Sequence, residues 1–123
     1  MDTEVIARQV LDAAFQVHST LGPGLLESVY ETCLAWELEH QGVDVARQVN
    51  VPIRYREREL TSGLRLDILV GDRVIVEARA VNEIAPIHKA QLLSYLKLAN
   101  LRIGLLLNFN VISMKNGIKR IVR

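Results

Sequence analysis

Residues that can do chemistry stand inside apolar stretches of this chain. Glu27, Asp67 and Glu77 each lie in a largely apolar stretch, and Arg79 follows Glu77 by two positions. Solubility does not explain such placement, because an isolated charge inside a protein is costly. If the fold brings the three carboxylates together, their oxygens form a site for a hard cation such as magnesium, of the kind that supports phosphodiester cleavage.

Two consecutive strands must position Asp67 and Glu77. Side chains alternate between the two faces of a strand. Within residues 64–70 Asp67 therefore falls on the more polar face, and the other face carries Leu64, Leu66, Ile68 and Val70. Within residues 74–81 Glu77 and Arg79 share one face, and the opposite face carries Val74, Val76, Ala78 and Ala80.

The turn at Gly71-Asp72 decides whether the two carboxylates meet. A three-residue loop, 71–73, pairs Val70 with Val74 and sets Asp67 opposite Glu77, with Cβ atoms about 5 Å apart. A two-residue loop sends Glu77 to the other face. A cation site therefore requires the three-residue loop or a bulge. Carboxylates this close repel each other unless one takes a proton or a cation binds between them.

Two helices carry the remaining candidates. Glu27 and Tyr30 lie three residues apart, on one face of a helix predicted over residues 25–41. Glu27 is either a ligand of the site or a first-turn residue favoured by the helix dipole. His88, Gln91 and Tyr95 form one stripe of a helix predicted over residues 86–100. A polar stripe of this kind is either part of a site or a solvated face.

The hydropathy pattern predicts an α/β fold, a mixed sheet flanked by helices in the order α-α-β-β-β-α-β. Helices are expected over residues 3–19, 25–41 and 86–100. Strands are expected over residues 49–53, 60–70, 73–81 and 103–109, with a short last strand over 118–122. Pro52 indicates an edge or a bulge, and Gly42 indicates the end of the second helix. The run 103–109 is apolar on both faces, which is typical of a central strand. We expect one domain over residues 1–123.

Composition narrows the class of protein. The chain has 123 residues, 50% of them hydrophobic, and one cysteine, Cys33, which excludes an internal disulfide and fits a reducing compartment. The start of the chain resembles no signal peptide, and no stretch approaches the roughly 20 apolar residues of a membrane span. We expect a soluble, cytoplasmic protein with no membrane partner and no small-molecule cofactor.

The charge pattern leaves two interpretations open. The net charge of +1 is lower than expected for a dedicated nucleic-acid binder. Basic residues nevertheless gather in two places, and these clusters either contact phosphates or are ordinary solvated faces. The clusters are Arg47, Arg54, Arg56, Arg58 and Arg65 in the middle of the chain, and Lys115, Lys119, Arg120 and Arg123 at its end.

The motif Gly24-x-x-Glu27-x-x-Tyr30 resembles the pattern that names the GxxExxY protein family, and the likeness continues through residues 48–51, 66–77, 91–97 and 104–108. That family is similar to small members of the PD-(D/E)XK nuclease superfamily, which implies one nuclease-like domain acting on nucleic acid. The resemblance implies Mg²⁺ or Mn²⁺ bound by Asp67, Glu77, the backbone carbonyl of Ala78, and Glu27. It also implies Arg79 at the motif lysine and a Gln91-x-x-x-Tyr95 helix. Tyr30, on the same face as Glu27, and His88, on the stripe with Gln91, are candidate accessory residues.

Arg79 departs from the superfamily pattern, which has a lysine at this position. Arginine keeps the positive charge but stays protonated, so it cannot act as a base, and it can form a bidentate ion pair with carboxylates. Three outcomes remain open: a nuclease with Arg79 as electrostatic stabiliser, a slow nuclease, and a metal-free relic. The alternative class is a catalytically inactive binding or assembly module, and a third is an oligomeric scaffold. Analogy with small nucleases suggests that the protein forms a homodimer. DNA or RNA, and endo- or exonucleolytic cleavage, are equally open.

Overall fold

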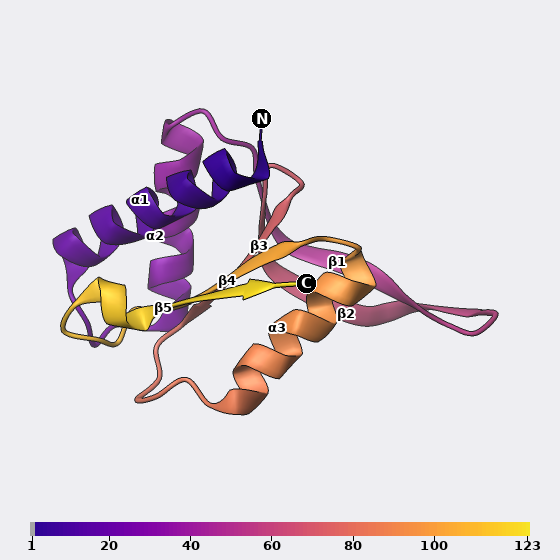
Figure 1. The fold of residues 1–123 in the computed structure, drawn as a ribbon. Helices are drawn as coiled ribbons and strands as arrows, with labels where there is room; N and C mark the ends of the chain where they lie inside the picture. The colour runs from indigo at the N-terminus through magenta and orange to yellow at the C-terminus, as the bar shows by residue number, and fades with distance from the viewer. Residues whose placement is uncertain (1) are drawn as a thin grey trace.

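The fold is a five-stranded mixed sheet with helices on both faces (Figure 1). The computed structural model describes residues 2–123. Its helices are α1 (Thr3–Leu21), α2 (Glu27–His40) and α3 (Pro86–Ala99). The strands run in spatial order β1-β2-β3-β4-β5. Their bounds are β1 (Val45–Tyr55), β2 (Arg58–Val70), β3 (Val74–Arg79), β4 (Ile103–Asn108) and β5 (Ile118–Val122), the last preceded by the 3₁₀ turn η1 (Met114–Gly117).

Two apolar clusters hold the layers together. Helices α1 and α2 lie on one face of the sheet and α3 lies on the other (Figure 1). Beneath α1 and α2, Val10 and Leu34 pack with Val76 and Leu105 of the sheet. Beneath α3, the cluster contains Leu64, Leu66, Ile75, Leu92, Leu96 and Leu106. Strand β4 is buried along its whole length, as its two-sided apolar pattern predicts.

The hairpin between β2 and β3 has the three-residue loop that a cation site requires, and not the two-residue alternative. Val70 pairs with Val74 and Ile68 pairs with Val76. The loop closes with a hydrogen bond of 3.0 Å from the backbone N–H of Arg73 to the carbonyl of Val70. Asp67 and Glu77 stand one position beyond the pair Ile68–Val76, so the register brings them opposite each other.

Strands β3 and β4 are parallel, and the other neighbouring pairs are antiparallel. The predicted fold class is confirmed, and β5 extends the seven-element core as the short last strand. Gly42 has a positive φ of 81° directly after the cap of α2. This is the left-handed conformation that glycine allows at a helix end.

The β1–β2 ribbon departs from the predicted pattern in two ways. Strand β1 is longer than residues 49–53, and it forms one edge of the sheet with a register shift between Val51 and Ile53 around Pro52. The expectation that Leu64, Leu66, Ile68 and Val70 share one face is wrong. The first two belong to the cluster beneath α3, whereas Ile68 and Val70 belong to the cluster beneath α1 and α2.

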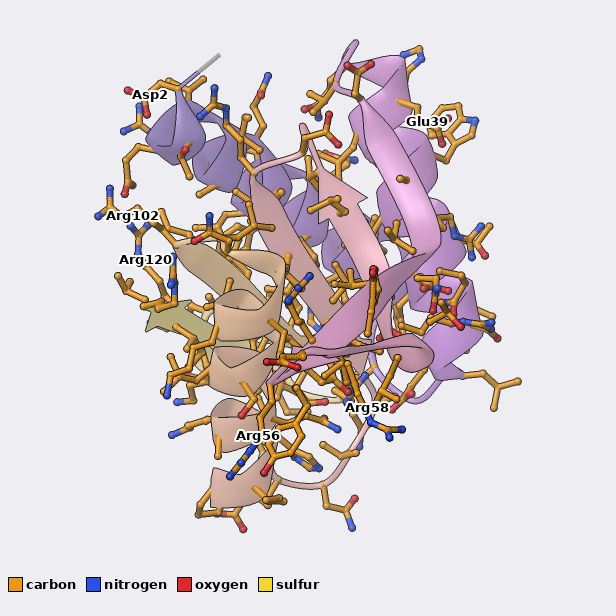
Figure 2. All side chains as sticks on the ribbon, turned by 90° about the vertical axis from the view of Figure 1, so that its right-hand side faces the viewer. Asp2, Glu39, Arg56, Arg58, Arg102 and Arg120 are labelled. Carbon is orange, nitrogen blue, oxygen red and sulfur yellow. The ribbon has the colours of Figure 1, made fainter. Side chains whose placement is uncertain are left out.

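The cause of this change of face lies in β1. Gln48 stands between the pairs Arg47–Ile68 and Val49–Leu66, and so opposite Asp67. Its φ of 52° is left-handed, which interrupts the regular strand. Beyond this point the ribbon leaves the body of the sheet (Figure 1), and Figure 2 looks toward its tip, where Arg56 and Arg58 are labelled. Asp67 therefore sits where the ribbon turns.

No helix of the described residues is long and apolar enough to cross a membrane.

Candidate active site

Arg79 occupies the point at which the predicted metal ligands converge. Its Nη1 lies 3.0 Å from Oδ2 of Asp67, 3.2 Å from the carbonyl oxygen of Ala78 and 3.5 Å from Oε2 of Glu77. Asp67 comes from β2, and Ala78 and Glu77 come from β3. Three of the four predicted ligand groups thus surround one positive charge that belongs to the chain itself.

Glu77 is the most buried member of this group, with 3% of the residue exposed. Burial, followed by hydrogen bonding with Asp67 and the charge of Asp67, raises the pKa of Glu77 to about 9, and Arg79 opposes the shift only in part. In the metal-free site at neutral pH, Glu77 therefore holds a proton and Asp67 is the carboxylate paired with Arg79. The Oε1 atom of Glu77 is buried and has no hydrogen-bond partner.

The charge of Arg79 is fixed. Burial lowers the pKa of its guanidinium, but the carboxyls of Glu77 and Asp67 outweigh burial and raise the pKa above its ordinary value. Arg79 is half-buried, with 19% of the side chain exposed. Arg79 therefore supplies a permanent positive charge and cannot act as a base.

Glu27 approaches the site from helix α2. It is the first residue of α2, and its Oε1 accepts a hydrogen bond of 3.2 Å from the backbone N–H of Ala80. This contact ties α2 to the end of β3, directly after Arg79. A cavity of about 200 Å³ lies between these elements, lined by Glu27, Ser28, Glu31, Gln48, Asp67 and Ala78.

The donor set can be tested against a divalent ion. Among the described residues, no three His, Cys, Asp or Glu side chains are arranged to hold a metal ion as they lie. The converging oxygens belong to two carboxyl groups and one backbone carbonyl, and ionised carboxylates and carbonyls are the ligands that Mg²⁺ and Mn²⁺ prefer. Oε1 of Glu77 is a further buried oxygen with no hydrogen-bond partner. The residues fit a hard cation, provided that the guanidinium leaves its place.

Gln91 and Tyr95 of α3 lie beside this group. Ile75 packs beneath α3, and alternation along β3 turns Glu77 and Arg79 toward the same helix. Partial burial raises the pKa of the Tyr95 phenol, the charge of Glu77 raises it further, and a hydrogen bond with Gln91 acts in the opposite direction. The structure thus brings Tyr95 into electrostatic range of Glu77.

The two accessory candidates have structural contacts. The Tyr30 hydroxyl donates to the carbonyl of Gly22 at 2.6 Å and accepts from the N–H of Leu25 at 3.1 Å. Its fully buried ring stacks on Phe109, with centroids 4.6 Å apart. Tyr30 therefore anchors the loop that leads into Glu27. His88 accepts a hydrogen bond from the N–H of Ala85 at 3.1 Å and so caps α3.

Three residues near the site were not predicted as members of it. Glu31 and Gln48 line the cavity and share a hydrogen bond of 2.9 Å. Asn108 is buried in β4 and pairs with Arg79 in the parallel register. Its amide donates to the carbonyl of Val81 at 2.9 Å and accepts from the N–H of Val81 at 3.1 Å. A buried asparagine at the end of an apolar strand was the available signal.

The mixed sheet, with two carboxyls and a cationic side chain on its neighbouring strands, defines a nuclease-like α/β domain. A family model described as the PD-(D/E)XK nuclease superfamily matches residues 4–121. The match spans nearly the whole chain, and the protein belongs to this superfamily. No curated protein and no solved structure gives a significant match. The match does not resolve a subfamily, so the likeness to the GxxExxY family stays a resemblance.

Proposed function

We propose that this protein hydrolyses phosphodiester bonds of nucleic acid with the help of Mg²⁺ or Mn²⁺. One observation carries the proposal: oxygens of Asp67, Glu77 and Ala78 gather around a single positive charge, Nη1 of Arg79. Oxygens that already surround one positive charge are placed to bind a metal cation instead. Membership of the nuclease superfamily supplies the substrate class.

The chain's own residues have distinct roles in this proposal. Asp67, Glu77 and the carbonyl of Ala78 would hold the ion, and Glu27 would add its carboxylate from α2. The chemistry that an ion held there would supply is polarisation of the scissile phosphate and a lower pKa of a water molecule. Arg79 stabilises the negative charge that develops on the phosphate, and Gln91 and Tyr95 orient the carboxyls or the substrate. Glu77 must lose its proton to act as a ligand.

The first test is a titration of the purified protein with manganese and magnesium, followed by calorimetry and thermal melting. Binding to the native state raises the melting temperature by mass action. We expect saturable binding by the wild type and by Asp12→Ala, which removes an exposed carboxylate on α1. Asp67→Ala should abolish it. Cleavage of single- and double-stranded DNA and RNA in the same buffers then identifies the substrate.

The contacts of Nη1 of Arg79 also favour a second candidate function. Arg79 already neutralises Asp67 and contacts the other oxygens, as expected of a nuclease fold kept as a binding or assembly module without turnover. The titration separates the two functions. If neither metal binds at millimolar concentration, with or without nucleic acid, Arg79 holds the site permanently and the binding module is the better description.

A further inference from the structure

Among the described residues, Arg79 forms hydrogen bonds through only one of its three guanidinium nitrogens. The contacts with Asp67, Glu77 and Ala78 all involve Nη1. Within the described residues, neither Nε nor Nη2 makes a hydrogen bond, and neither is a buried atom without a partner. Arg79 has 19% of its side chain exposed, and since neither donor is a fully buried atom without a partner, both keep some access to solvent.

The free edge matches the geometry of a phosphate. The Nε–H and Nη2–H groups of arginine point the same way and form a fork that binds two oxygens of one phosphate. Here the other end of the guanidinium holds the fork against the carboxyls of Asp67 and Glu77. A phosphate bound to it would therefore lie next to the oxygens that would hold the ion.

The same guanidinium also competes with the ion. Nη1 occupies the position where the oxygens of Asp67, Glu77 and Ala78 converge, so a divalent cation and Nη1 cannot both take these oxygens in the observed geometry. Moving an arginine away from two carboxyls is costly unless its charge gains another partner. The phosphate of a nucleic acid is such a partner, and it arrives at the free edge.

We propose that Arg79 is the phosphate receptor of this site and that it makes the binding of nucleic acid and of the divalent cation mutually dependent. A phosphate takes the fork and draws the guanidinium away from the carboxyls, and the vacated oxygens take the ion. By linkage, the ion must strengthen nucleic-acid binding by the same factor as nucleic acid strengthens ion binding. This inference rests on the proposed function, since it requires both ligands at one site.

The test measures the affinity for fluorescent single-stranded and duplex DNA and RNA by anisotropy, with and without Mg²⁺ at constant ionic strength and on samples in which a gel shows the probe uncleaved, and the affinity for Mn²⁺ alone by calorimetry. The variants are Arg79→Ala and Arg79→Lys. Arg8→Ala is the matched control, because Arg8 is exposed on α1. Melting curves establish that each variant is folded.

We expect Mg²⁺ to tighten nucleic-acid binding at least fivefold in the wild type and in Arg8→Ala. In Arg79→Ala, nucleic-acid binding should weaken at least fivefold and tighten less with Mg²⁺ than in the wild type, because only the direct contact between ion and phosphate would remain, while Mn²⁺ alone binds more tightly than in the wild type. Arg79→Lys, which keeps the charge and loses the fork, should fall between the two.

The outcomes separate this inference from the proposed function. Equal nucleic-acid affinity in the wild type and Arg79→Ala overturns the phosphate receptor. Independent binding of Mg²⁺ and nucleic acid in the wild type overturns the coupling, although metal binding that depends on Asp67 would leave the proposed function standing. Absence of metal binding under every condition contradicts both the coupling and the proposed function.

Discussion

Nη1 of Arg79 lies 3.0 Å from Oδ2 of Asp67, and this ion pair connects two neighbouring strands at the site. Glu77 is close to the same nitrogen, at 3.5 Å, yet burial keeps its pKa near 9. One positive charge therefore balances one carboxylate, and a proton balances the other. The metal-free site is close to neutral, which explains how three ionisable groups share a largely buried position.

The proton on Glu77 makes stability depend on pH. The ordinary pKa of this carboxyl is 4.5, and the folded protein raises it to about 9. Between these values the folded state binds more protons than the unfolded state, so Glu77 stabilises the fold fully below pH 4.5 and this contribution is lost as pH rises toward 9. The slope from one group is at most about 1.4 kcal/mol per pH unit.

We expect Glu77→Gln to remove this dependence, because glutamine resembles the protonated carboxyl and does not titrate. In EDTA, the free energy of unfolding of the variant, measured by urea denaturation, should increase relative to that of the wild type as pH rises from 5 to 8.5. Glu83→Gln, at an exposed glutamate, is the control. Parallel pH profiles for wild type and Glu77→Gln would show that Glu77 is ionised in the fold.

Tyr30 is expected to stabilise the protein through its hydroxyl. In Tyr30→Phe, the carbonyl of Gly22 and the N–H of Leu25 lose their partner. A buried polar group left unpaired costs about 1–3 kcal/mol. The free energy of unfolding should fall by about that amount in a urea titration. Tyr55→Phe is the matched control, since Tyr55 is 64% exposed, and its free energy of unfolding should equal that of the wild type. Similar losses in the two variants would contradict the anchoring role.

Gln48 is expected to be under backbone strain. Its φ of 52° lies in the left-handed region, where a side chain with a Cβ atom is disfavoured. Gln48→Gly and Gln48→Ala both lose the bond to Glu31, but only the glycine variant also loses the strain. The glycine variant should therefore be more stable than the alanine variant by about 1 kcal/mol by chemical denaturation. The reverse order would mean that the strand is regular at Gln48 in solution.

The sequence predicted features that depend on local spacing. Alternation along residues 74–81 placed Glu77 beside Arg79, and the same spacing showed that Asp67 meets Glu77 only across a three-residue loop or a bulge, of which the structure has the loop. It did not predict the change of face at Asp67, because this depends on the conformation of Gln48 in a strand that pairs nearly 20 residues away. The contacts of Nη1 likewise depend on the final side-chain conformation, which spacing does not determine.

Local sequence patterns did not predict the contacts of Asn108 either, because these contacts depend on the parallel pairing of β3 and β4 across the α3 crossover. Its buried side chain bonds to both backbone groups of Val81 and accepts from the N–H of Asn110 at 3.2 Å. Since Val81 follows Arg79 by two residues, these bonds fix the course of the chain as it leaves the site.

Asn108→Ala removes all three bonds at once and leaves partly buried backbone groups unpaired, so we expect a loss of about 2–4 kcal/mol in the free energy of unfolding. Asn116→Ala, at an exposed position in η1, should have little effect. Hydrogen exchange distinguishes positioning from general stability. If Asn108 holds the end of β3, the N–H of Val81 should exchange faster in Asn108→Ala by a larger factor than the amides in the middle of β4. An equal increase throughout the sheet would mean that Asn108 stabilises the fold without specifically ordering the site.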